Sequence, residues 1–194
     1  MKTITFGDVI PHEEYERQRE AFRANIIELK RRRRLSIGPL ITVVFENRET
    51  LQFQIQEMIR TERIVDPLKV QDELDVYNAL LPHPNELSAT LLIEITDEAT
   101  IKEKLDQFMG LDHGEKVAIT AGGEEAFGEF EGGRSHETKI SAVHFVRFHP
   151  TASMRAAFAD LTRPVTIRVN HGGYHQEVPV PGSMREEWLA DLRA

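Results

Sequence analysis

The stretch ITVVFENRETLQFQIQEMIRTERI, residues Ile41 to Ile64, decides the fold, because it predicts a buried strand that runs straight into a helix. The strand is predicted from the β-branched and aromatic residues between Ile41 and Phe45, which can be buried on both faces of a sheet. It ends at Glu46. Asn47 can then cap a helix whose first turn holds Glu49, an anion that the helix dipole favours. We expect this helix to run to the end of the stretch.

The predicted helix is apolar on two sides. At a period of 3.6 residues, Glu62 falls near the middle of one apolar stripe, which consists of Leu51, Ile55, Met58 and Ile59. Glu57 falls between Phe53 and Ile64 on the opposite side. A helix that is apolar on two sides is covered on two sides, so we expect both carboxylates to be partly enclosed. An enclosed carboxylate needs a cation, hydrogen-bond donors or a proton.

Two interpretations of this polarity are open. In the first, the nearest cations, Arg48, Arg60 and Arg63, form a buried network with the carboxylates that only holds the fold. In the second, the carboxylates form a site for a metal ion or a proton. A simpler alternative is that Glu62 lies close enough to the helix end to turn into water. The residues expected in the buried polar network are Glu46, Arg48, Gln56, Glu57, Arg60, Glu62, Arg63 and Glu94.

A run of five cations, KRRRR, closes a predicted first helix that begins near Pro11 and has an apolar stripe of Tyr15, Phe22, Ile26 and Leu29. Cations at this end complement the negative pole of the helix dipole, which explains the run without any ligand. The alternative is a surface that binds RNA, a nucleotide phosphate or an acidic partner protein. The residues of this predicted anion or partner patch are Lys30, Arg31, Arg32, Arg33 and Arg34.

Composition limits the class of protein. A chain of 194 residues with 40% hydrophobic content can bury a sizeable core. No apolar run is long enough to span a bilayer and no signal-peptide pattern is present, so we expect a cytoplasmic protein without a membrane partner. The absence of cysteine excludes disulfides, thiolate catalysis and a self-ligated iron-sulfur cluster. The net charge of -8 argues against a nucleic-acid binder, although residues 1–34 carry nine Lys or Arg against six Asp or Glu.

The rest of the chain predicts further helices and then mostly strands. We expect helices at 66–81, 98–109 and 153–161 and from Ser183 onward, and a strand at 88–95. The glycine pairs at 122–123 and 132–133 separate strands at 116–121, 126–131 and 138–148, and a hairpin is expected at 165–180. The sequence therefore predicts one α+β domain, helix-rich over 1–110 and strand-rich over 111–194. Its N-terminal helices should pack on a mainly antiparallel sheet or open barrel.

Histidine is the remaining source of chemistry. His144 should share an apolar strand face, and a histidine there is more often a hydrogen-bonded core residue than a ligand. His175 and Glu177 form an H-x-E triplet, as in one fragment of a non-haem iron facial triad, but no later histidine completes it. The alternative is a metal site assembled in three dimensions from histidines together with Glu46, Glu57 or Glu94. The histidines of this predicted metal site are His144, His149, His171 and His175.

Several segments resemble one family. FENRETLQFQIQEMIRTERI, ELDVYNALLP and NELSATLLIEI, together with YERQREAFR, KRRRR and the closing WLADL, are similar to a bacterial family of proteins of about two hundred residues, classified only as a domain of unknown function. The resemblance implies genes encoded beside rubrerythrin and an iron-sulfur oxidoreductase. It supplies no catalytic residue. Phosphate-binding glycine loops and the G-x-S-x-G serine motif are absent from the sequence.

Two hypotheses of function follow. The first is an accessory or interaction protein in bacterial peroxide and iron redox metabolism, whose basic run binds a rubrerythrin-like or iron-sulfur partner. The second is a small metal-dependent enzyme, or metal-binding protein, that uses His and Glu. The sequence requires no cofactor, and iron or another divalent metal is the one that the second hypothesis would use. Neither a reaction nor an oligomeric state is indicated.

Overall fold

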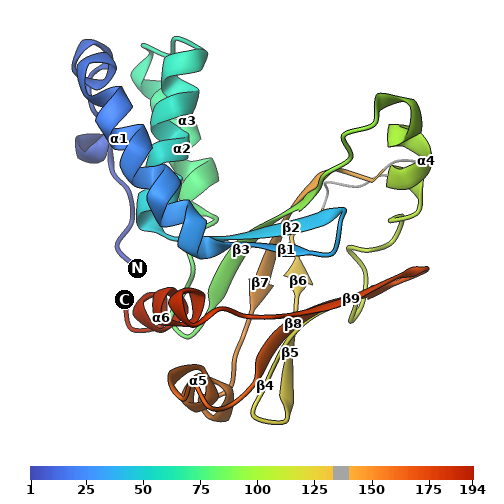
Figure 1. The fold of residues 1–194 in the computed structure, drawn as a ribbon. Coiled ribbons are helices and arrows are strands. Elements are labelled where there is room, and N and C mark those ends of the chain that lie inside the picture. Colours follow the sequence, from blue (N-terminus) through green and yellow to red (C-terminus); the bar gives the residue numbers. More distant parts are fainter. Residues whose placement is uncertain (133–139) are drawn as a thin grey trace.

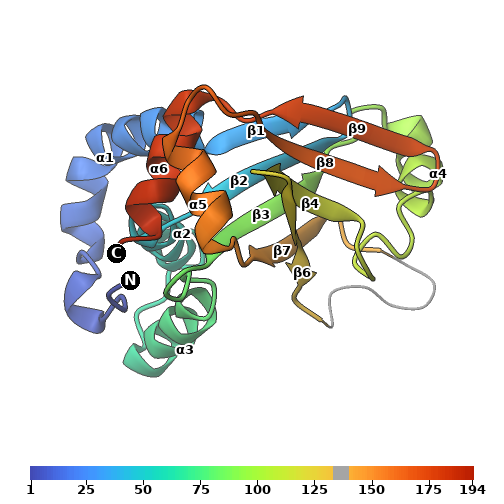
Figure 2. The same ribbon diagram turned by 90° about the horizontal axis from the view of Figure 1, so that it is seen from below.

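The strands form two antiparallel sheets in the computed structural model, which describes residues 1–132 and 140–194. The first sheet has the order β1 (Arg34–Ile37), β2 (Ile41–Glu46), β3 (Leu87–Ile93), β7 (Val143–Phe148) and β6 (Glu129–Phe130). The second has the order β5 (Glu124–Phe127), β4 (Val117–Ala121), β8 (Val165–His171) and β9 (Tyr174–Pro179). Both sheets are shown in Figures 1 and 2. The predicted α+β class, with N-terminal helices on mainly antiparallel strands, is confirmed.

The predicted strand at the start of the quoted stretch is confirmed as β2. All six of its residues are buried, because β1 and β3 pair with its two edges while the core and the helices cover its faces. Ile41, Val43 and Phe45 point into the space between the sheets. The alternate residues, including Thr42 and Glu46, therefore point to the face that carries α2.

One predicted strand, at 126–131, is two strands in different sheets. The chain leaves β5 at Phe127 and enters β6 at Glu129, and Gly128 lies at the corner between them. A Cβ at Gly128 would lie 2.6 Å from Val146 Cγ1 and 3.2 Å from Phe148 Cε1. The sheets therefore approach so closely at this corner that only glycine fits.

A second junction joins the opposite edges of the sheets. β1 contacts β8 and β9, and the Tyr174 hydroxyl donates to the carbonyl of Ile37, the last residue of β1. Gly38, in the turn after β1, has φ of 72° and packs against the side chains of Tyr174 and Gln176. No hydrogen-bonded strand ladder crosses this junction in the described residues, so the sheets form an open barrel.

The helices gather mainly at one end of the sheets. α1 (His12–Arg33), α2 (Arg48–Thr61) and α3 (Pro67–Asn78) stand together, and α2 contacts both neighbours (Figure 1). α5 (Ala152–Ala159) packs on α6 (Gly182–Asp191), which also contacts α1. α4 (Ile101–Asp106) lies at the other end, while the two chain termini lie close together beside α6 (Figure 2). Short 3-10 turns occur at Phe6–Asp8 and Glu98–Thr100.

Two hydrophobic clusters hold these layers. The larger fills the space between the sheets and extends under α5 and α6, where Trp188 packs on Phe45 and Phe158. The smaller lies among α2, α3 and the N-terminal segment, and includes Leu51 and Leu74. In the described residues, no helix combines the length and apolar character needed to cross a membrane.

Most predicted elements are confirmed with shifted ends. α2 ends at Thr61 rather than Ile64, and α3 ends at Asn78 rather than Leu81. The predicted strand at 138–148 begins only at Val143 within the described residues. Its first two residues, and Gly133 of the predicted second glycine turn, lie outside the residues described.

Candidate functional site

Glu57 belongs to a compact ionic cluster between α1 and α2. Tyr15 donates its hydroxyl to Glu57 Oε1 at 2.6 Å. Arg19 donates Nε and Nη2 to the two carboxylate oxygens at 2.8 and 2.7 Å, and Arg60 Nε lies 3.4 Å from Oε1. The Arg19 hydrogen bonds lower the pKa of Glu57 to about 2, against the opposing effect of burial. The carboxylate is therefore ionised at neutral pH, and side chains of the same chain already bind both of its oxygens.

The predicted partners of Glu57 were only partly right. Arg60 takes part, but the principal cation, Arg19, lies 38 positions away in the sequence. Arg48 instead pairs with Asp8 at 2.7 Å. The prediction missed Arg19 because it considered only cations near Glu57 along the chain. Arg19 lies one turn after the buried Tyr15 on α1 and is itself partly exposed, and that spacing was the available signal.

Glu62 and Arg63 do not belong to a buried network. Both are exposed, because α2 ends at Thr61, where Glu62 becomes the residue after the helix and Arg63 turns the chain with φ of 53°. The alternative in which Glu62 turns into water is thus the correct one.

The other predicted network residues lie at separate joints. Gln56 is buried and exchanges two hydrogen bonds with the backbone of Ile10, so it fixes the segment before α1. Glu94 is 43% exposed and accepts from Arg34 at 2.7 Å and from Thr42 at 2.6 Å. The eight predicted residues therefore do not form one network.

Glu46 is a buried carboxylate that is surrounded by neutral hydrogen-bond donors. It is 2% exposed and accepts from Thr50 at 2.5 Å, Thr90 at 2.7 Å and Gln54 at 3.2 Å. All three donors are neutral, and no cation of the described chain pairs with it. Its hydrogen bonds join the first turn of α2 to β3. Because the side chain is enclosed, a ligand could reach it only if this joint opened.

The basic run divides between the interior and the surface. Arg33 is 1% exposed and donates to both oxygens of Asp191, at 2.7 and 2.9 Å, and to Glu187 at 2.8 Å. Burial alone would lower the pKa of Arg33, but these carboxylates raise it overall. Arg32 also reaches Glu187, at 2.8 Å. This pairing joins α1 to α6 through buried and half-buried ion pairs.

The surface part of the run lies on the outer side of α1. Arg31 is 72% exposed, and its contact with Glu28 at 3.0 Å is an exposed pair of one helical turn. Lys30 is half-buried. Ile27 is 51% exposed, with Arg31 one turn after it and Arg23 one turn before it. A shallow hollow of about 470 Å³ runs along this side. It is lined by Glu16, Arg19, Glu20, Arg23, Ala24 and Ile27.

The four histidines of the predicted metal site are not brought together. His144 is fully buried in the first sheet and bonds through Nε2 to the carbonyl of Ser141 at 2.8 Å. His149 lies at the end of β7, 3.6 Å from Glu129 and 3.9 Å from Glu86. His171 and His175 lie in the second sheet. In residues 1–132 and 140–194, no group of three His, Asp or Glu is placed to hold a metal ion.

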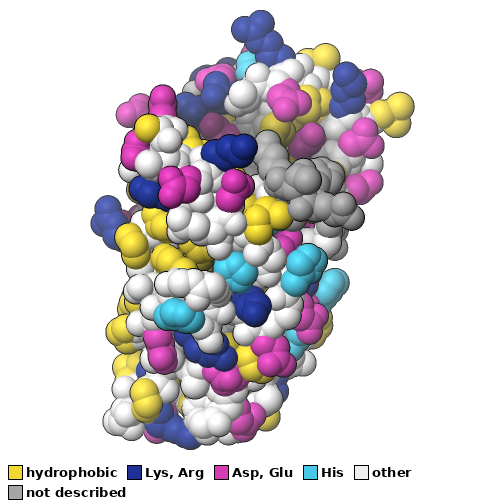
Figure 3. All heavy atoms as spheres, turned by 90° about the vertical axis from the view of Figure 1, so that its right-hand side faces the viewer, with side chains coloured by type: hydrophobic (Ala, Val, Ile, Leu, Met, Phe, Trp, Pro, Cys, Tyr) yellow, Lys and Arg dark blue, Asp and Glu magenta, His cyan; other side chains and the backbone are white. Residues whose placement is uncertain are grey.

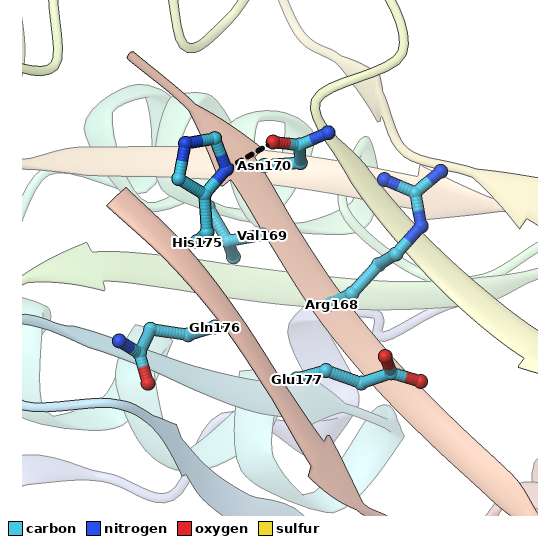
Figure 4. A pocket seen from close by; sticks show the side chains of 6 residues that line it. All are labelled: Arg168, Val169, Asn170, His175, Gln176 and Glu177. Carbon is cyan, nitrogen blue, oxygen red and sulfur yellow. Dashed lines mark hydrogen bonds between the residues drawn. The ribbon is translucent and has the colours of Figure 1, made fainter. Parts of the chain in front are cut away.

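The H-x-E triplet lies on the outer face of the β8–β9 hairpin. His175 is opposite Asn170 and bonds to it, and Glu177 is opposite Arg168 (Figure 4). These residues line an open hollow of about 480 Å³. Glu177 accepts from Thr166 at 2.6 Å, while Arg168 pairs with Glu125 at 2.7 Å. The polar groups of the triplet are therefore bound to neighbouring residues of the hairpin.

Histidine side chains are also visible at the end of the molecule that carries α4, among charged side chains of both signs (Figure 3). His113 is 83% exposed there, with Nε2 3.8 Å from Asp112. His171 is stacked near Phe108, and burial lowers its pKa, with Lys116 acting in the same direction. This histidine is therefore neutral at neutral pH and serves as part of the packing of the hairpin on the loop after α4.

Comparison with known proteins identifies the family of this chain, but it indicates no reaction and no ligand. The family model described as "Protein of unknown function (DUF3501)" matches residues 3–192. The fold also matches a crystal structure of a novel protein of unknown function from Burkholderia pseudomallei K96243, with 30% sequence identity and a TM-score of 0.89. That match covers 98% of this chain and 100% of the other. No curated protein matches. The chain belongs to the DUF3501 family of proteins of unknown function.

Proposed function

We propose that this protein is an accessory protein of the bacterial cytoplasm that binds an acidic partner protein through the outer side of α1. The binding surface, called the α1 patch below, consists of Arg23, Ile27, Lys30 and Arg31. The observation that carries the proposal is Ile27, whose side chain is 51% exposed between two arginines on a helix that is otherwise well packed on its inner side.

The chemistry of the α1 patch suits an interface. Complete burial of an exposed isoleucine is worth about 1.5–3 kcal/mol, and Ile27, at 51% exposure, would gain roughly half of this when a partner covers it. Arginine is enriched at interfaces, and charges around an apolar centre select a partner of opposite sign and speed its approach. The contact of Arg31 with Glu28 is an exposed pair, which is worth at most about 1 kcal/mol, so Arg31 can exchange it for a partner's carboxylate.

The α1 patch includes only two residues of the basic run, Lys30 and Arg31. Arg32 and Arg33 pair with α6, and Arg34 pairs with Glu94, so their charges are engaged within the chain. Arg23 replaces them on the outer side, because residues at i, i+4 and i+8 share one side of a helix. A partner would therefore meet three cations spread over two turns.

The place of this binding in peroxide and iron redox metabolism rests on the family resemblance alone. In this proposal the partner is a rubrerythrin-like or iron-sulfur protein, and the iron belongs to the partner. The chain would supply recognition, through charge and one apolar contact.

The test is co-purification of the full chain with its partner from the native host, in about 50 mM salt and in about 500 mM salt. We expect an acidic iron protein to be retained at low salt and released at high salt. The triple variant Arg23→Ser, Ile27→Ser, Arg31→Ser should lose it, because all three are surface residues whose removal leaves the fold intact. The double variant Lys102→Ser, Lys104→Ser removes two cations from α4 and should retain the partner.

Retention of the same partner by the triple variant, or loss from both variants alike, would show that the α1 patch is not the binding surface. A retained partner that lacks iron would leave the binding surface standing and refute the redox assignment. Substituting Arg31 through Arg34 together is unsuitable, since Arg33 is buried and its loss would destabilise the fold itself.

A further inference from the structure

A second helix presents apolar side chains to solvent. Val65, Leu68 and Val76 are 88%, 76% and 57% exposed, and Val65 and Leu68 exceed every other large hydrophobic residue described. Leu68 and Val76 lie on the side of α3 opposite Val70 and Leu74, which pack into the core. Apolar side chains of this size gathered at one helix are typical of an interaction surface.

Most of the charged side chains around these residues are acidic, although Arg63 and Lys69 also lie there. Asp72 lies one turn from both Leu68 and Val76, and Asp75 precedes Val76. The α3 surface, as it is called below, consists of Val65, Leu68, Asp72, Asp75 and Val76. Burial raises the pKa of the neighbouring Glu73, and the charges of Glu62 and Asp72 raise it further. Negative charge therefore accumulates around α3.

The α1 patch and the α3 surface are complementary. The α1 patch has Ile27 among three cations, with Glu20 and Glu28 nearby, and the α3 surface has Leu68 and Val76 beside two carboxylates, with Lys69 nearby. Within one chain they do not cover each other, because Ile27 and Leu68 are both largely exposed. The two helices stand on either side of α2 in the same group, so both surfaces are accessible at one end of the molecule (Figure 2).

We propose that the α1 patch of one copy docks on the α3 surface of a second copy. The inference rests on the α1 patch of the proposed function and identifies a second copy of this chain as one acidic partner of it. Charge complementarity favours this pairing over a contact between two α1 patches or between two α3 surfaces, because like charges would face each other in either of those contacts. Salt should weaken the pairing, because all the charges involved are at the surface.

Sedimentation equilibrium of the full chain, from about 1 μM to about 200 μM, measures the association. In low salt we expect the average mass to rise above that of one chain, and in high salt to fall back. The charge reversal Asp72→Arg, Asp75→Arg should weaken self-association by at least about tenfold, and so should Arg23→Glu, Arg31→Glu. The variant Glu98→Arg, Glu103→Arg, on the other end of the molecule, should associate like the unaltered chain.

Mixing the two reversed proteins is the decisive measurement. Each should associate much more weakly alone than the unaltered chain, but together they should form a one-to-one complex. The mixture pairs the unaltered α1 patch of one variant with the unaltered α3 surface of the other, and the reversed α1 patch with the reversed α3 surface. This recovery also shows that both variants are folded. A chain that is monomeric at every concentration and salt, or a mixture that does not associate, overturns the proposal.

The same variants separate this inference from the proposed function. The reversal on α3 leaves the α1 patch intact, so capture of an acidic iron protein should persist in that variant. If the unaltered chain captures the iron protein but stays monomeric in the sedimentation experiment, the second-copy pairing is refuted and the proposed function is left in place.

Discussion

Glu57 illustrates, at the scale of one residue, how a charged group on a helix becomes part of a joint between helices. Its two oxygens accept from Tyr15 and Arg19 of α1, and Arg60 of its own helix lies nearby. The cluster is partly exposed, with 23% of the Glu57 side chain accessible. Glu46 shows the other solution, in which neutral hydroxyl and amide donors surround a buried carboxylate.

The lowered pKa of Glu57 predicts how stability depends on pH. Its pKa falls from 4.5 to about 2 on folding, so the folded chain binds fewer protons at this group than the unfolded chain. The stabilisation is therefore fully present above about pH 4.5 and is lost as the pH falls towards about 2. We expect Glu57→Gln to lower the free energy of unfolding by about 2 kcal/mol at neutral pH, with the difference shrinking through this window.

Urea unfolding at a series of pH values from neutral to about 2.5 measures this difference. Glu13→Gln, at an exposed position of α1, should stay within about 0.5 kcal/mol of the unaltered protein throughout. A Glu57→Gln difference that did not change with pH would mean that the ionised Glu57 carboxylate contributes nothing to stability.

At the scale of an element, α1 has a different task on each side. Its inner side carries Tyr15, Ile26, Leu29 and the buried guanidinium of Arg33, which together fix the helix on α2, β2 and α6. Its outer side carries the α1 patch. The run of cations thus crosses from the surface to the interior within one turn, because successive helical residues are rotated by about 100°.

This division predicts opposite results for two neighbouring arginines. Arg33→Met leaves Asp191 and Glu187 without their buried cation, so we expect a loss of about 3–5 kcal/mol in the free energy of unfolding. Arg31→Met removes an exposed charge and should change stability by less than about 0.5 kcal/mol. Thermal and urea unfolding of both variants would decide. If the two variants lost the same amount of stability, the effect would come from the place of both residues at the end of α1 and not from the burial of Arg33.

At the scale of the whole molecule, two corners hold the sheets around a common core. The chain passes from the second sheet to the first at Gly128, and β1 adjoins β9 at the turn containing Gly38. β3 from the first half of the chain pairs with β7 from the second half. The helix-rich and strand-rich halves of the sequence therefore share one sheet.

The corner at Gly128 predicts the effect of one methyl group. Gly128→Ala would place a Cβ 2.6 Å from Val146 Cγ1, inside the core, so we expect a loss of about 1–3 kcal/mol in the free energy of unfolding. Gly173→Ala, where no atom lies within 4 Å of the added Cβ, should be nearly neutral. Unfolding of the two variants in urea makes the comparison. A neutral Gly128→Ala would mean that the corner can relax.

The site was less predictable from the sequence than the fold. β2 and its helix were predictable because alternation, β-branched residues and the Asn47 cap act within a few residues. The corner at Gly128 was not, since a single glycine within a run of strand residues does not say which sheet each side joins. The metal hypothesis depended on histidines from this group of four converging with a glutamate, and the histidines lie on different sheets.

The sequence by itself determined the α+β class, the buried central strand and the helix that follows it, and the amphipathic first helix, because each depends on local periodicity and capping. Only the tertiary structure decided which charged residues join helices through ion pairs and which lie at the surface. Arg33 and Asp191 lie 158 positions apart, and Arg19 and Glu57 lie 38 apart. The physical reason is that an ion pair is selected by the packing of helices against each other, which no local pattern contains. The same packing leaves Arg31 and Ile27 exposed and buries Arg33 beside them.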